Sequence, residues 1–139
     1  MRKKTRFPLI LLVLSIILIG CTGSVMNIKV IDSSSRALNI EIFSQDSLTG
    51  KKSLQKISYV SFYRVISDTK MDMIWSLTSK NIHSGEDLHQ IIYGVIPRNF
   101  FAATAHKSIR SGDIIYITFD LEKSGIVQPL KNFEVKIGN

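Results

Sequence analysis

Few side chains in this sequence have the type and spacing that chemistry at a site requires. Cys21 is the only cysteine, so the chain has neither an internal disulfide nor a zinc site made of several thiolates. The three histidines, His83, His89 and His106, form neither a His-x-His nor a His-Glu-x-x-His pattern, and we interpret them as surface or half-buried side chains. The sequence therefore predicts no metal site and no cofactor.

Patterns of nucleophilic and acid–base catalysis are also missing from the sequence. It contains no Gly-x-Ser-x-Gly nucleophile motif. Residues 49–53 read Thr-Gly-Lys-Lys-Ser, like the end of a phosphate-binding loop, but the upstream glycine of such a loop is missing and we expect a solvated turn. Glu86 and Asp87 are adjacent, so in a strand their carboxylates point to opposite faces. We therefore expect that the protein is not an enzyme.

The first 20 residues have the organisation of a secretory signal. Arg2, Lys3, Lys4 and Arg6 form a basic region, and residues 9–19 form an apolar run of 11 residues. A helix needs about 20 apolar residues to span the hydrocarbon core of a membrane. The run is therefore too short to be a stable transmembrane helix and is typical of a signal peptide.

Leu18, Ile19, Gly20 and Cys21 follow in the order aliphatic, variable, small, cysteine. This order resembles the lipobox of bacterial lipoproteins. The resemblance implies that a diacylglyceryl group is transferred to the Cys21 sulfur, that the chain is cleaved between Gly20 and Cys21, and that the new amino group is acylated, with palmitate as a typical acyl chain. Several acyl chains anchor better than one, because each buried CH₂ adds about 0.8 kcal/mol. The alternative is an ordinary signal peptide followed by a buried free thiol.

Such an anchor predicts a protein of the cell envelope that contacts the membrane through lipid on Cys21. In a Gram-negative source, an Asp after the cysteine favours retention in the inner membrane. Thr22 therefore predicts the inner leaflet of the outer membrane, facing the periplasm, with the inner membrane as the alternative. We expect a signal peptide over residues 1–20, the lipidated cysteine and a short tether over 21–26, and one domain over 27–139.

The formal charge of +7 does not indicate a nucleic-acid-binding domain. Four of the 18 basic residues belong to the signal region, which leaves 14 basic and 11 acidic residues in the mature chain. Lys51 and Lys52 are the only adjacent basic pair in the mature chain, and basic residues do not alternate with aromatic ones. We expect no nucleic-acid partner and instead a protein partner.

The mature chain has the pattern of an all-β domain. Several segments alternate apolar and polar residues with period 2, which is typical of half-buried strands. In residues 71–77 this alternation predicts that Met71, Met73, Trp75 and Leu77 share one face. The other segments are 28–30, 38–42, 55–66, 115–121 and 133–137, and turn-forming residues separate them at 32–35, 49–52, 67–68, 111–113 and 123–125.

The stretch 84–94 admits two interpretations. Residues 84–87 resemble a weak capping box, and Leu88, Ile91 and Ile92 have helical spacing. The competing interpretation is a strand over 90–93 that Gly94 and a following proline end. We favour the strand, because the rest of the domain is β and tertiary context overrides local propensity.

Six or seven short strands without long helices predict a small immunoglobulin-like β-sandwich of about seven strands, behind the lipoprotein signal peptide. Trp75 is expected in its core. Gly112 and Tyr116 are similar to the entry of the F strand in immunoglobulin-like domains, where a tyrosine corner forms. Here the Tyr follows the Gly by four residues instead of three, so a tyrosine corner stays an open question.

Two segments carry residues that suit protein interfaces. Arg98, Phe100 and Phe101 follow a predicted strand end, and aromatic residues with Arg are typical of interface hot spots. Lys51 and Lys52 lie at a predicted hairpin tip. The alternatives are that one or both Phe rings close the end of the sandwich, and that the Lys pair is a solvated turn.

The order of motifs from Tyr59 onward suggests a family. Residues 60–63 (Val-Ser-Phe-Tyr) are followed by Trp75, and residues 92–100 are similar to a Tyr-Gly-x-x-Pro-x-Gly-Phe motif in which Asn99 stands for the second Gly. Asn tolerates a left-handed backbone better than most residues. Together with the lipobox, these motifs resemble, over residues 59–137, small enterobacterial lipoproteins described as type VI secretion immunity proteins.

This resemblance implies a periplasm-facing protein that binds and neutralises a toxin delivered by another cell. Two other functions stay open. One is a generic envelope lipoprotein that acts as an accessory or assembly factor, or as an inhibitor of a hydrolase. The other is an enzyme that acts on cell-wall or glycan substrates, which the missing catalytic motifs make the weakest of the three.

Overall fold

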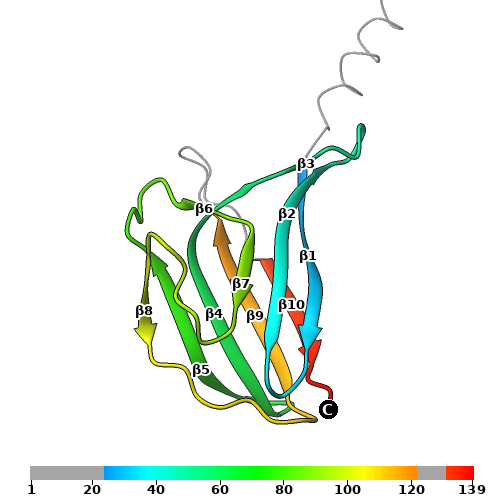
Figure 1. Cartoon of the computed structure of the whole chain (residues 1–139), viewed down its shortest axis with the longest axis vertical. Coiled ribbons are helices and arrows are strands. Elements are labelled where there is room, and N and C mark those ends of the chain that lie inside the picture. The colour runs from blue at the N-terminus through cyan, green and yellow to red at the C-terminus, as the bar shows by residue number, and fades with distance from the viewer. Residues whose placement is uncertain (1–23, 122–130) are drawn as a thin grey trace, which may run out of the picture.

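The computed structural model describes residues 24–121 and 131–139, which contain ten strands and no helix (Figure 1). The strands form two antiparallel sheets, so the predicted all-β sandwich is confirmed. The signal region, Gly20, Cys21 and the turn predicted at 123–125 lie outside the described residues. The strands are β1 (Ser24–Ser33), β2 (Leu38–Asp46), β3 (Lys52–Ser53), β4 (Gln55–Ser67), β5 (Lys70–Ser79), β6 (Glu86–Leu88), β7 (Gln90–Ile92), β8 (Phe100–Thr104), β9 (Ile114–Leu121) and β10 (Lys131–Lys136).

The first sheet consists of β1, β2, β3 and β7. β1 pairs with β2 along its length, while β3 and β7 pair with the opposite edge of β2 at its two ends. The second sheet has the order β10-β9-β4-β5-β8, and β6 pairs with the first residues of β4. Figure 1 shows β8 at one edge of the sandwich and β1 with β10 at the other.

The core lies between the sheets and follows the predicted alternation. Ile115, Ile117, Phe119 and Leu121 on β9 are at most 6% exposed, while the residues between them face outward. Trp75 is 1% exposed, as predicted. Period-2 alternation is a local property of the strand, and this is why the sequence reveals which side of β9 is buried.

The predicted alternation in residues 71–77 is wrong, because β5 contains a β-bulge. Phe62 pairs with Trp75 and Tyr63 pairs with Met73, so Ile74 is an extra residue on β5. Both Ile74 and Trp75 are buried. Met73 therefore lies beside the outward-facing Tyr63 and not on the face of Trp75.

The strand interpretation of residues 84–94 is confirmed, although the strand is split in two. β6 pairs with β4 in the second sheet, and β7 pairs with β2 in the first. The chain crosses from one sheet to the other at His89, whose carbonyl oxygen accepts a hydrogen bond of 2.8 Å from the N–H of Ile42. Seven strands have five or more residues, which agrees with the expected number. One of the seven is β8, which was not predicted, whereas β7 in the segment predicted as a strand over 90–93 has only three residues.

The expected tether over 21–26 overlaps the first strand. β1 begins at Ser24, which pairs with Asp46, and Met26 is 4% exposed in the core. The domain therefore begins at or before Ser24, and the boundary expected at residue 27 falls inside β1. Further along the chain, the N–H of Gly138 donates to the carbonyl of Ser33 at 2.7 Å, which joins the β1 and β10 edges of the sandwich.

Candidate partner-binding surface

The outward face of the second sheet carries three tyrosines. Tyr59 and Tyr63 alternate on β4 with the buried Val60 and Phe62, and Tyr116 alternates on β9 with buried isoleucines. All three tyrosines therefore point away from the core and are partly exposed. For Tyr116 this placement means that it does not form the tyrosine corner that the sequence left open.

Strand register brings these tyrosines together with two other large side chains. Tyr63 lies between Met73 on β5 and Tyr116 on β9. Tyr59 pairs with Thr78 on β5, and Thr78 in turn pairs with Phe101 on β8. Adjacent strands are about 4.8 Å apart, so side chains that pair in this way are neighbours. We call the surface formed by Tyr59, Tyr63, Met73, Phe101 and Tyr116 the tyrosine face.

A row of hydroxyl side chains crosses the sheet between two other rows, one that contains Tyr63 and one that contains Tyr59. Ser61 on β4 pairs with Ser76 on β5 and with Thr118 on β9, and Ser76 pairs with Thr104 on β8. Ser61 and Ser76 are 1% and 0% exposed, and within the described residues neither hydroxyl has a hydrogen-bond partner. These two buried hydroxyls form the floor beneath the tyrosine face.

Of the predicted partner-binding residues, Phe101 joins this face and Phe100 does not. Phe101 is 48% exposed and pairs with Thr78, whereas Phe100 pairs with Ser79 and is 3% exposed. The two rings alternate because β8 is a strand, which the sequence analysis did not predict. The prediction that Phe100 contacts a partner is therefore wrong, and its ring packs in the core.

Arg98 is exposed at a tight turn that leads into β8. The N–H of Phe100 donates to the carbonyl of Pro97 at 3.1 Å, and Asn99 has a φ of 67°. A turn with positive φ at its third residue is typical of type II, and Asn tolerates this conformation. Asn99 thus adopts the left-handed backbone that the glycine of the similar motif would adopt at this position. Its carbonyl also accepts the N–H of Lys80 at 2.8 Å, which fixes the turn on the end of β5.

Lys51 and Lys52 lie elsewhere, on the hairpin that connects β2 and β3. Both side chains are exposed, and the Lys52 ammonium lies 4.1 Å from the centroid of the Phe43 ring. Asp46 holds the hairpin turn by accepting the N–H groups of Leu48 and Thr49 at 2.9 and 2.7 Å. The structure therefore does not bring Lys51 and Lys52 together with Arg98 and Phe101 on one sheet.

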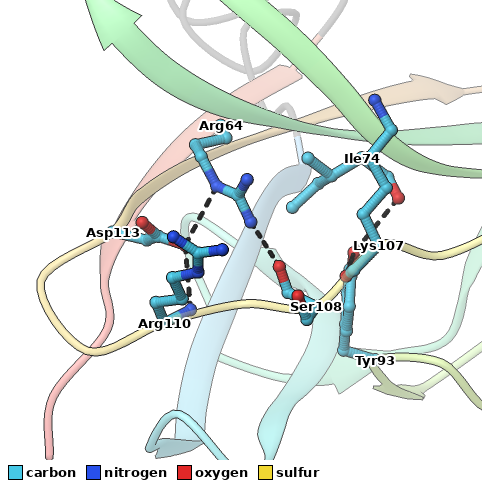
Figure 2. Close-up of polar contacts among 7 residues, drawn as sticks. All are labelled: Arg64, Ile74, Tyr93, Lys107, Ser108, Arg110 and Asp113. Carbon is cyan, nitrogen blue, oxygen red and sulfur yellow. Dashed lines mark hydrogen bonds and ion pairs between the residues drawn. The ribbon is translucent and has the colours of Figure 1, made fainter.

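Tyr93 holds the segment between β7 and β8 in place (Figure 2). Its hydroxyl lies 2.8 Å from the carbonyl oxygen of Lys107 and 3.1 Å from that of Ile74, so it donates its proton between them. Its ring packs edge-on against Trp75 and Phe62, with centroids 5.1 and 5.5 Å apart. Burial raises the pKa of the Tyr93 hydroxyl from 10.0 to about 12, so the donor proton is retained at neutral pH.

Arg64 fixes the segment that follows β8. Its Nε donates to Asp113 at 2.9 Å, and Nη2 donates to the carbonyl of Ser108. Asp113 also accepts the N–H of Arg110 at 2.9 Å, as Figure 2 shows. The Arg64 and Asp113 side chains are 19% and 16% exposed, so this pair is partly removed from water. Together with Tyr93, it attaches both ends of the β8 region to the sandwich.

The sequence analysis missed the tyrosine face, although part of its signal was present. Tyr59, Ser61 and Tyr63 alternate along the chain with Val60 and Phe62. This alternation predicts that one strand has an outward side with aromatic residues. It does not tell which strands lie beside β4. Phe101 and Tyr116 join the face only through the pairing of distant segments.

The described residues contain no cluster of three or more His, Cys, Asp and Glu side chains that could hold a metal ion. No helix within residues 24–121 and 131–139 is long and apolar enough to cross a membrane. Comparison of the chain with family models, curated proteins and solved structures found no match. The resemblance to type VI secretion immunity lipoproteins therefore stays a prediction.

Proposed function

We propose that this chain is a lipid-anchored, periplasm-facing protein that binds a protein partner through the tyrosine face. The partner that fits the resemblance is a type VI secretion effector, which the chain neutralises by direct binding. The observation that carries the proposal is the row pattern on the second sheet, where Tyr59, Tyr63, Tyr116 and Phe101 flank the buried hydroxyls of Ser61 and Ser76.

The composition of this face favours a protein partner. Tyr, Phe and Met are enriched at the cores of protein interfaces. Aromatic rings offer a large contact area and lose little conformational freedom. The face extends over five residues of β4 and four strands, which corresponds to roughly 300 Å². A stable complex buries about 800 Å² on each partner, so we expect the contact to extend beyond the face to the neighbouring turn that carries Arg98.

The surface is supported from behind, and this also suits binding. The Phe62 and Trp75 rings lie 5.2 Å apart beneath the sheet, and Tyr93 packs on both. Preorganised surfaces lose less entropy on association. Neutralising a toxin requires such a surface and no catalytic group, because blocking the access to the toxin is sufficient.

The test begins with the full-length chain, tagged at its C-terminus and purified from membranes of its source strain together with its partner. The partner is then exported to the periplasm of a sensitive cell, with and without this protein. For immunity we expect killing by the partner alone and survival with the protein. A partner that is not toxic and belongs to an envelope assembly would instead support the accessory function and contradict immunity.

A variant pair locates the binding surface. Tyr63→Glu combined with Tyr116→Glu places two charges on the tyrosine face, and we expect the affinity to fall by more than about 30-fold, as for a hot-spot loss of about 2 kcal/mol. Ile31→Glu is the control, because Ile31 is 53% exposed on the first sheet. If the double variant binds as tightly as the control, the tyrosine face is not the site.

A further inference from the structure

The end of the sandwich at which the chain enters β1 also carries the β2–β3 hairpin. Ser24 pairs with Asp46, the last residue of β2, and Lys52 on β3 pairs with Gln45. In Figure 1 this hairpin projects beyond the second sheet at that end of the domain. The beginning of β1 and the hairpin are therefore neighbours, although more than 20 residues separate them in the sequence.

Exposed apolar and basic side chains gather on this end. Leu48 at the hairpin tip is 75% exposed, more than any other large apolar side chain of the described residues, and Leu54 and Val25 are 58% and 49% exposed. Lys51 and Lys52 are exposed beside them. We call these five residues the tether-end surface.

The hairpin presents Leu48 in a fixed turn. Asp46 accepts hydrogen bonds from the N–H groups of Leu48 and Thr49 and, at 3.0 Å, from the Thr49 hydroxyl. The N–H of Gly50 donates to the Asp46 carbonyl at 2.9 Å. The Asp46 carboxylate is thus occupied by its own turn and forms no ion pair with Lys51 or Lys52, which are exposed residues, although the Lys52 ammonium also lies over the Phe43 ring.

The lipobox places an acylated cysteine close to this surface. Cys21 precedes Ser24 by three residues, and a chain spans at most about 3.5 Å per residue. Ser24 therefore lies within roughly 10 Å of the lipid-bearing residue, and the headgroup region on each side of a bilayer is about 5–7 Å thick. The hairpin beside Ser24 is within reach of the same membrane surface.

We propose that the tether-end surface docks onto the lipid leaflet that holds the anchor. Leu48 enters the boundary between headgroups and acyl chains, and Lys51 and Lys52 contact anionic headgroups. This inference rests on the proposed lipidation of Cys21. Docking directs the β4–β5 hairpin away from the membrane, because β4 extends for 13 residues from this end, or roughly 40 Å. The tyrosine face then lies on a side of the domain that is open to the periplasm.

The experiment uses the full lipidated protein in vesicles of phosphatidylethanolamine and phosphatidylglycerol with brominated acyl chains, which quench a nearby indole. Leu48→Trp reports on the tether-end surface. Ile66→Trp is the matched control, because Ile66 is 52% exposed at the β4–β5 hairpin. Both variants also contain Trp75, which is buried and contributes the same background fluorescence. We expect fluorescence loss for Leu48→Trp and none beyond the background for Ile66→Trp.

Charge reversal tests the role of the lysines. In the Leu48→Trp protein, Lys51→Glu combined with Lys52→Glu should reduce quenching on anionic vesicles. At about 1 kcal/mol for each lysine, the ratio of docked to free domain should fall about 30-fold. On zwitterionic phosphatidylcholine vesicles the same reversal should change little.

The outcomes separate this inference from the proposed function. Suppose that the protein incorporates labelled palmitate. Equal quenching of both indoles, quenching of neither, or quenching of Ile66→Trp alone then overturns the docking and leaves the proposed anchor intact. If the protein incorporates no labelled palmitate, the result contradicts the proposed anchor and also the docking, which depends on that anchor.

Discussion

The hydroxyl of Tyr93 lies 2.8 Å from the carbonyl oxygen of Lys107, which ties the end of β7 to the segment that follows β8. Fourteen residues separate the two groups in the chain. The same hydroxyl lies 3.1 Å from the carbonyl oxygen of Ile74 on β5. Because β7 belongs to the first sheet and β5 and β8 to the second, the Tyr93 hydroxyl links the two layers of the sandwich at the edge that carries β8.

Replacing Tyr93 by Phe removes this link and keeps the ring. We expect a loss of about 1 kcal/mol in the free energy of unfolding, the usual contribution of one hydrogen bond. Urea denaturation of Tyr93→Phe and of the unmodified domain measures the difference. The raised pKa gives a second readout, because stability that is present below pH 10.0 should fade as the pH rises toward about 12 and Tyr93 ionises. Tyr93→Phe should lack this alkaline loss, and an equal loss in both proteins would contradict the assignment.

Gly94 should resist substitution more strongly than Gly112. Both have positive φ, 82° and 87°, but a Cβ on Gly94 would lie 3.3 Å from the His106 ring, whereas nothing lies within 4 Å of a Cβ on Gly112. Gly112→Ala should therefore cost only the backbone strain, about 1–2 kcal/mol, and Gly94→Ala should cost more. Thermal unfolding compares the two.

The excess cost of Gly94→Ala should disappear in a His106→Ala background, since the ring that crowds the new methyl group is then gone. An excess that persists without the ring would show that the imidazole is not its cause.

Asp46 should contribute to the loss of stability in acid. The N–H and hydroxyl of Thr49, followed by the N–H of Leu48, hold the pKa of the Asp46 carboxyl below its ordinary value of 3.8. A lowered folded-state pKa stabilises the domain above pH 3.8, and this contribution is lost as the pH falls through the folded-state pKa. Asp46→Asn should reduce the decline of Tm in acid, and Asp68→Asn in the β4–β5 turn is the control. An unchanged decline in Asp46→Asn would argue against this role.

Cys21→Ser should abolish lipid attachment. The serine hydroxyl cannot replace the sulfur that receives the diacylglyceryl group, so labelled palmitate should not be incorporated and the protein should leave the membrane fraction. Cell fractionation with labelling measures both effects. A variant that stays in the membrane and still incorporates palmitate would show that the anchor is not at Cys21.

The sequence by itself determined the properties that depend on neighbouring residues. Period-2 alternation predicted the buried side of β9, and the tolerance of Asn for a left-handed backbone is compatible with the turn observed at Asn99. The strand over 90–93 was correctly preferred to a helix, since alternation in the rest of the chain set the class of fold.

Only the tertiary structure decided what depends on distant pairings. The bulge at Ile74 moved Met73 away from the face of Trp75, and the unpredicted strand β8 buried Phe100 while it exposed Phe101. Pairing also placed Tyr116 beside Tyr63. The alternation within a strand shows which of its residues share a side, but the elements that lie beside and against that strand come from elsewhere in the chain. The energy of that packing is non-local, and for this reason the surface proposed to bind a partner became visible only in the folded domain.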